Sequence, residues 1–158
     1  EMVRLRQEND AIADKLVNWT RSLLLESDPA RLPGTLIDEL KRVFDVPYAG
    51  LRLWSAVPGV AAQECALPVE SDTISLANSM RVPFCGSNVG FEAATWFDEG
   101  AAIQSLAMLP LRVGADPATF GLLVLGSADK DRFHITMGTA FLERIAELAS
   151  AALARLRG

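Results

Sequence analysis

The stretch that decides the fold reads A-M-L-P-L-R-V-G-A-D-P-A-T-F-G-L-L-V-L-G-S, from Ala107 to Ser127. Two apolar runs flank a segment at 114–117 whose glycine, aspartate and proline favour a tight reversal of the chain. We therefore expect two strands, over residues 103–111 and 120–127, joined as a hairpin. The Leu-Leu-Val-Leu run inside the second strand predicts that this strand is buried on both faces.

The residues that follow the hairpin predict a loop and then a long terminal helix. The loop at 129–135 carries His134, the only histidine of the chain. Thr136 is expected to cap a helix that runs to about Leu156. One broad apolar stripe predicts that this helix is deeply packed; it consists of Met137, Phe141, Leu142, Ile145, Leu148, Ala149, Ala152, Leu153 and Leu156.

Residues 1–27 predict a single helix with a heptad register. The apolar positions are spaced alternately by three and four residues, and Asn9 occupies an a position. A lone Asn at such a position specifies a parallel two-stranded coiled coil, because two amides can satisfy each other across the axis. We expect a homodimer on this ground. The alternative is an amphipathic helix that packs on its own domain. The a and d positions of the heptad register are Met2, Leu5, Asn9, Ile12, Leu16, Trp19 and Leu23.

Between these two ends the pattern alternates less clearly. We expect, in order, a helix over 29–43, a strand over 49–56 and a weaker second strand over 61–67. A helix over 71–80, a loop or short extended piece over 82–86 and a short helix over 90–99 follow. Strands that pair through hairpins, with helices first and last, predict an α+β fold with an antiparallel sheet.

Composition narrows the possible partners. The chain has 158 residues, of which 50% are apolar, and a net charge of −5. Scattered basic residues and an acidic balance argue against nucleic acid, and no apolar run approaches the ~20 residues of a membrane span. Cys65 and Cys85 lack a CxxC pattern or a neighbouring histidine, so we expect free thiols in a cytoplasmic protein and no metal site. Because the chain begins at Glu1, we expect that a preceding segment was removed.

Several of these runs resemble a known family. P-L-R-V at 110–113, F-G-L-L-V-L-G-S at 120–127, R-F at 132–133 and the alanine-rich final helix resemble the closing half of a GAF domain. More narrowly, the whole run F-G-L-L-V-L-G-S-A-D-K-D-R-F-H-I-T-M-G-T-A-F-L is similar to the C-terminal signature of a bacterial family known as domain-of-unknown-function family 484. R-Q-E-N near the N-terminus and F-C-G at 84–86 are similar to that family as well.

The resemblance implies a GAF-like domain over residues 28–158. Its antiparallel sheet would have five or six strands, with the terminal helices packed on one face and a pocket on the other, under the variable middle segment. The resemblance implies no catalytic mechanism. Cyclic-nucleotide-binding relatives carry an Asn-Lys…Phe-x3-Asp-Glu pattern, of which this chain has only the run at 97–99, and bilin-binding relatives carry a Cys beside a His. The sequence therefore excludes both ligands.

Six residues are candidates for lining such a pocket: Trp54, Phe84, Cys85, Ser105, Met108 and His134. Side chains alternate along a strand, so Ser105 and Met108 face opposite sides and only one of them can belong to the pocket. Catalysis by a thiol would need Cys85 within reach of His134 and a third group to orient the histidine. The sequence offers no such group, so we assign no catalytic residue and expect no enzyme.

These observations lead to a signalling hypothesis. We expect a sensory or regulatory domain that binds an unidentified small molecule and dimerises through its N-terminal and terminal helices, with the cofactor, if any, unknown. The alternative is a purely structural interaction domain with a filled core. A cavity above about 300 Å³ beneath residues 70–100 would favour the sensor, and a close-packed interior there would favour the alternative.

Overall fold

The sheet is centred on the antiparallel pair β3 (Ser105–Leu111) and β4 (Gly121–Ser127). The structure is a computed structural model, which describes residues 2–54, 58–97, 102–133 and 139–157. β1 (Tyr48–Leu53) pairs with β4, and β2 (Phe84–Ser87) pairs with β3, giving an antiparallel sheet in the order β1-β4-β3-β2. The predicted hairpin and the α+β class are confirmed.

The sheet has four strands in the described part of the chain, so the expectation of five or six is corrected. The second strand predicted at 61–67 does not form. Two short 3₁₀ turns, Pro58–Val60 and Glu64–Ala66, occupy this region instead. The physical reason lies in its composition, since alanine, glutamine and glutamate are poor strand formers and the run contains no β-branched residue.

β4 is buried along its whole length, as its apolar run predicts. Leu123 and Leu125 point into a core shared with the helices, whereas Leu122 and Val124 point into a second core on the opposite face. This alternation follows from the two-residue period of a strand. The sheet is therefore the middle of three layers.

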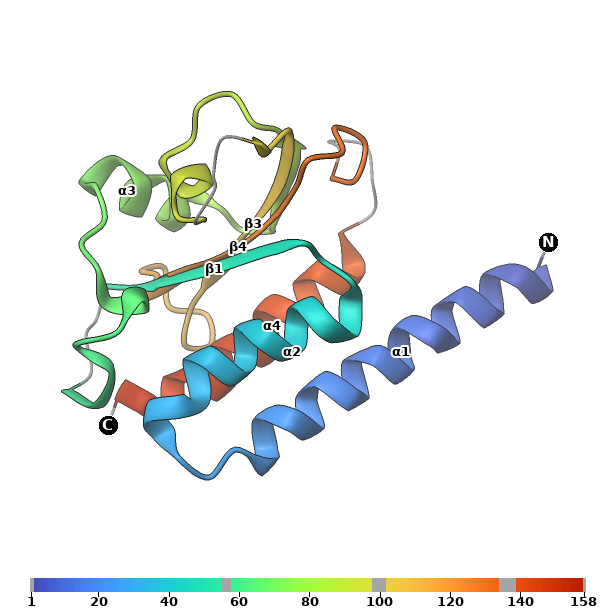
Figure 1. The fold of residues 1–158 in the computed structure, drawn as a ribbon, viewed down its shortest axis with the longest axis horizontal. Helices are drawn as coiled ribbons and strands as arrows, with labels where there is room; N and C mark the ends of the chain where they lie inside the picture. Colours follow the sequence, from blue (N-terminus) through green and yellow to red (C-terminus); the bar gives the residue numbers. More distant parts are fainter. Residues whose placement is uncertain (1, 55–57, 98–101, 134–138, 158) are drawn as a thin grey trace.

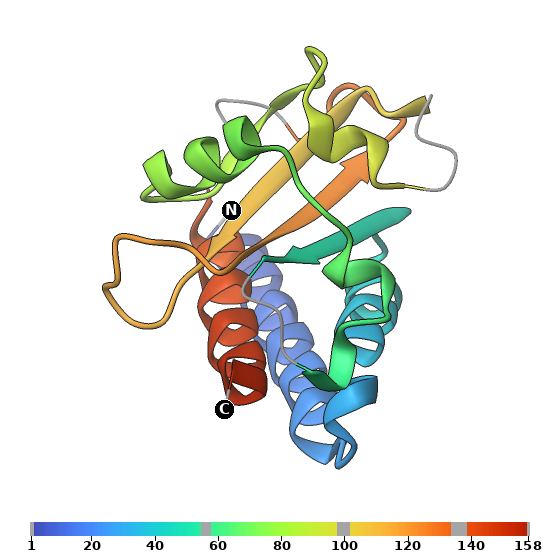
Figure 2. The same cartoon turned by 90° about the vertical axis from the view of Figure 1, so that its left-hand side faces the viewer.

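The helical layer consists of α1 (Met2–Leu25), α2 (Leu32–Phe44) and α4 (Ala140–Ala154), all on one face of the sheet (Figures 1 and 2). A short turn, Pro29–Arg31, precedes α2 and is capped by the Asp28 side chain, which accepts a hydrogen bond from the Ala30 N–H at 3.0 Å. The expected packing of the terminal helices on one face is thus confirmed. Thr136, the expected cap of the last helix, lies outside the described residues.

The other face is covered by the middle segment, which contains α3 (Ser71–Ser79) and a 3₁₀ turn at Glu92–Thr95. The helix predicted at 71–80 is confirmed. The helix predicted at 90–99 is only a single short turn among the described residues, and the extended piece predicted at 82–86 contains the start of β2.

α1 packs against its own domain along the face that carries Trp19 and Leu23, which are 0% and 2% exposed. The Trp19 Nε1 donates a hydrogen bond to the Leu36 carbonyl at 3.2 Å, and its ring meets that of Phe44 edge-on at 6.4 Å. Three a/d positions of the heptad register, Leu16, Trp19 and Leu23, therefore pack within the chain. The first turns of α1 project beyond the rest of the chain (Figure 1), and the coiled-coil dimer stays a prediction.

Replacing Trp19 by alanine tests this packing. The change removes a fully buried indole and its hydrogen bond, so we expect the free energy of unfolding to fall by about 3–5 kcal/mol, measured by urea denaturation. Lys15→Ala is the matched control, because Lys15 lies on the same helix and is exposed. Its cost should stay within about 0.5 kcal/mol. Equal small losses for both variants would show that α1 is not docked as described.

Candidate functional site

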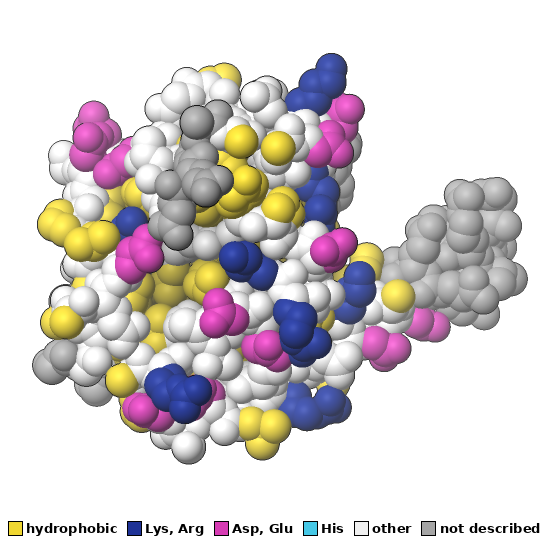
Figure 3. All heavy atoms as spheres, in the orientation of Figure 1, with side chains coloured by type: hydrophobic (Ala, Val, Ile, Leu, Met, Phe, Trp, Pro, Cys, Tyr) yellow, Lys and Arg dark blue, Asp and Glu magenta, His cyan; other side chains and the backbone are white. Residues whose placement is uncertain are grey.

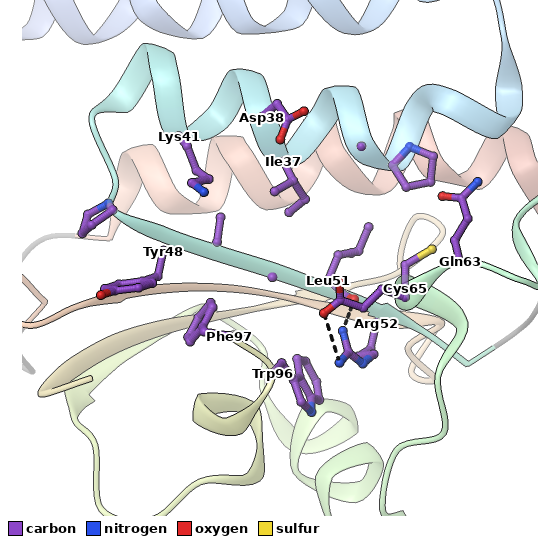
Figure 4. A pocket seen from close by; sticks show the side chains of 16 residues that line it. Ile37, Asp38, Lys41, Tyr48, Leu51, Arg52, Gln63, Cys65, Trp96 and Phe97 are labelled. Carbon is purple, nitrogen blue, oxygen red and sulfur yellow. Dashed lines mark hydrogen bonds and ion pairs between the residues drawn. The ribbon is translucent and has the colours of Figure 1, made fainter. Parts of the chain in front are cut away.

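A hollow with a volume of about 540 Å³ runs along the outer edge of β1 (Figures 3 and 4). Ile37, Asp38 and Lys41 of α2 form one wall, and Trp96 and Phe97 of the middle segment form the opposite wall (Figure 4). Apolar surface in this region is flanked by acidic and basic side chains (Figure 3). The remaining lining residues are Pro33, Gly34, Gln63, Glu64, Cys65 and the run at 47–52.

The floor of the hollow is the edge of a strand rather than one of its faces. Among the described residues, β1 is the last strand on its side of the sheet, since β4 is its only partner there. Six consecutive residues, 47–52, line the hollow. Because successive side chains of a strand point to opposite faces, a continuous run lines one hollow when that hollow opens onto the edge of the strand.

Arg52 is the most unusual group in this site, because it is a cation that is only 6% exposed. Its guanidinium lies 5.0 Å from the centre of the Trp96 ring, and its Nη1 donates a hydrogen bond to the Leu51 carbonyl at 3.0 Å. Its Nη2 lies 3.9 Å from Oε1 of Glu64, whose side chain is 62% exposed. Burial lowers the pKa of Arg52, and the charge of Glu64 acts in the opposite direction.

The nearest carboxylate, that of Glu64, is exposed and lies 3.9 Å away, and the charge of Glu92 acts on Arg52 more weakly, so the buried charge is compensated only in part. An anionic or strongly polar group in the hollow would complete the partners of this guanidinium. The site therefore combines one aromatic wall, a strand edge and a buried cation with several polar or charged side chains, so its lining is more polar than that of most small-molecule pockets.

The residues predicted from sequence lie elsewhere and on two different faces of the sheet. Trp54, Phe84 and Met108 belong to the core beneath the middle segment, whereas Cys85 belongs to the core shared with the helices. Ser105 also faces the helices: its Oγ donates to the Asp129 carbonyl at 2.7 Å and accepts from the Phe133 N–H at 3.2 Å.

Ser105 thus holds the loop after β4, and the expectation that Ser105 and Met108 face opposite sides is confirmed. Trp54 donates from Nε1 to the Thr119 carbonyl at 2.9 Å. His134 lies outside the described residues. None of the five described candidates lines the hollow at β1, and their role in ligand binding stays a prediction.

The face beneath the middle segment is closely packed where it is described. Trp96, Phe97 and Ile103 are at most 7% exposed and cover the sheet there. The Phe97 ring lies so close to Gly126 that a Cβ on that glycine would meet it at 3.0 Å. The hollow exceeds 300 Å³, but it opens beside this packed layer and not beneath it.

Cys65 and Cys85 are free and buried. Burial raises the pKa of both thiols, that of Cys85 to about 11. A reactive or redox-sensing cysteine needs a lowered pKa. Cys85 is therefore a small buried apolar group in this fold.

The described residues contain neither a metal-binding cluster nor a candidate membrane span. No group of three or more His, Cys, Asp or Glu side chains there is arranged to hold a metal ion. No described helix has the length and apolar character needed to cross a bilayer.

The three layers define an α+β domain of the GAF type. The fold is similar to the crystal structure of "the GAF domain of a putative sensor histidine kinase from Pseudomonas syringae pv. tomato", with a TM-score of 0.64 and 21% sequence identity over 99% of this chain and 94% of that chain. The chain belongs to the family described as protein of unknown function, DUF484, whose model matches residues 1–157. No curated protein matches it in sequence.

The raised pKa of Cys85 predicts a pH dependence of stability. The folded state keeps the thiol proton up to about pH 11, whereas the unfolded state loses it above about pH 9. The stabilisation is therefore complete below pH 9 and is lost between pH 9 and 11, where the free energy of unfolding should fall by roughly 2–3 kcal/mol more in the wild type than in Cys85→Ala.

The measurement is urea denaturation at a series of pH values, with Ser87→Ala, at an exposed position two residues along, as the control. Parallel pH curves for the wild type and Cys85→Ala would contradict the raised pKa.

Proposed function

We propose that this chain is a non-catalytic sensory or regulatory domain that binds a small molecule in the hollow at β1 and dimerises through its helices. The observation that supports it most directly is the buried Arg52 guanidinium at the side of a hollow of about 540 Å³ on a GAF-type fold. A buried guanidinium whose nearest carboxylate lies 3.9 Å away has a free-energy cost that an anionic ligand would offset.

The site is connected to the helices by direct packing. α2 supplies one wall of the hollow and also contacts α1, through the Trp19 hydrogen bond to the Leu36 carbonyl. A ligand that moves α2 relative to β1 would therefore act on α1. This is a short mechanical path from the hollow to the helix that we expect to dimerise.

A second apolar stripe on α1 supports the dimer. Ala13, Val17 and Leu24 fall on one side of the helix, at spacings of four and seven residues, and all three are exposed, Val17 by 56% and Leu24 by 72%. This stripe is separate from the buried face that carries Trp19. Apolar side chains at this spacing are available to a second copy of the helix.

One observation favours the alternative of a structural interaction domain without a ligand. The packed layer beneath the middle segment leaves the described part of the usual GAF pocket face filled by Trp96, Phe97 and Ile103. On this alternative the hollow at β1 holds only solvent.

Native mass spectrometry of the protein purified from its own host tests the proposed function. We expect a dimer mass together with a retained small molecule. Arg52→Met should release this molecule, because it removes the buried cation and leaves the volume nearly unchanged. Arg144→Met is the matched control, since its side chain is 67% exposed on α4. A ligand-free wild type would favour the structural alternative, and retention by Arg52→Met would place the ligand elsewhere.

The same spectra test the dimer. The double change Val17→Glu with Leu24→Glu should give a monomer, because it charges the exposed stripe without touching the buried face. Val89→Glu, at a position that is 77% exposed outside the helices, should leave the dimer intact. A double variant that remains dimeric would show that another surface holds the two copies together.

A further inference from the structure

We propose that the ligand of the hollow at β1 is a short extended peptide that adds to the sheet as a strand. This inference rests on the proposed function, because it names the class of molecule that the same site would hold. It is carried by the hydrogen-bonding groups of β1 that point into the hollow.

The direction of these groups follows from the register of β1 on β4. The Trp54 N–H donates to the Phe120 carbonyl at 2.9 Å, in line with the pairing of the strands. In an antiparallel pair, alternate residues turn both main-chain groups toward the partner. Arg52, Gly50 and Tyr48 therefore face β4, and Ala49 and Leu51 turn their N–H and C=O groups outward.

The outward groups are largely available. Within the described residues, neither main-chain group of Ala49 has a hydrogen-bond partner, and the same is true of the Leu51 N–H. The Leu51 carbonyl is covered by Arg52 of the same chain. Two donors, the N–H groups of Ala49 and Leu51, and one acceptor, the Ala49 carbonyl, thus remain. They have the two-residue spacing with which an added strand forms hydrogen bonds.

The shape of the hollow selects a single strand as occupant. Ile37 on one wall and Phe97 on the other rise on opposite sides of the strand edge (Figure 4). An added strand lies about 4.7–4.9 Å from its neighbour and sends successive side chains to opposite faces. Alternate peptide side chains would therefore meet α2 and then the aromatic wall.

The same walls exclude a larger partner. The edge of a second folded sheet would collide with α2 and with the middle segment before it could reach Ala49, whereas an isolated extended segment fits between them. Charged residues beside an edge strand also discourage uncontrolled pairing, and Asp38, Lys41 and Glu64 stand along this one. The walls and the charged residues thus disfavour pairing of β1 with the edge of another folded sheet, but they leave room for a single extended peptide.

The probe is a library of random heptapeptides displayed on phage and selected on the complete chain. A selected peptide, synthesised with both ends blocked, is then titrated into the wild type, Ala49→Pro and Ala49→Ser. Proline removes the outward N–H but is tolerated at an edge, where no ladder hydrogen bond is lost. We expect Ala49→Pro to weaken binding at least tenfold and Ala49→Ser to bind like the wild type.

A measurement on the wild type covers the case in which Ala49→Pro folds poorly. In ¹⁵N spectra, addition of the selected peptide should shift the amide signals of Ala49 and Leu51 and give contacts from the peptide main chain to these amides. The proposal is overturned if no peptide is enriched, if the peptide binds Ala49→Pro with wild-type affinity, or if the shifted amides lie elsewhere.

Failure of this inference can be distinguished from failure of the proposed function. A non-peptide molecule that is retained by the wild type and released by Arg52→Met would overturn the peptide and keep the regulatory site. A chain that retains no small molecule and enriches no peptide would overturn both.

Discussion

The burial of β4 on both faces is the constraint on which the other layers depend. Leu123 and Leu125 require one apolar cover and Leu122 and Val124 require another, so the sheet cannot lie at the surface. The helices supply the first cover and the middle segment the second. The close approach of β1 within the sheet also fixes Gly121 on β4, where a Cβ would stand 2.6 Å from the Arg52 carbonyl oxygen.

The hollow is a consequence of how these covers meet the edge of the sheet. Over β4 and β3 the two layers close on the strands, but α2 and the pair Trp96 and Phe97 stand apart at β1. The segment that follows β1 forms 3₁₀ turns, of which Glu64–Ala66 contacts β1, and no described strand pairs with the outer edge of β1. Arg52 lies at this opening, stacked on Trp96, and covers one carbonyl of the strand with its own guanidinium.

Periodicity and turn chemistry were enough to predict the hairpin, the helical ends and the two-sided burial of β4, because each is encoded locally. The predicted strand at 61–67 was wrong, since its weak alternation was outweighed by alanine, glutamine and flanking prolines. The site was missed because its walls come from α2, β1 and the middle segment, which only the fold brings together. One signal was present in the sequence: an arginine at position 52 inside the predicted strand at 49–56.

Amide hydrogen exchange of the ligand-free protein tests the open edge of β1 most directly. The N–H groups of Gly50 and Arg52 bond to β4, whereas those of Ala49 and Leu51 point into the hollow. Exchange rates along β1 should therefore alternate, with Ala49 and Leu51 exchanging at least tenfold faster than Gly50 and Arg52. Uniformly slow exchange across these four residues would show that another segment of the chain already pairs with the edge, and would contradict an open site at β1.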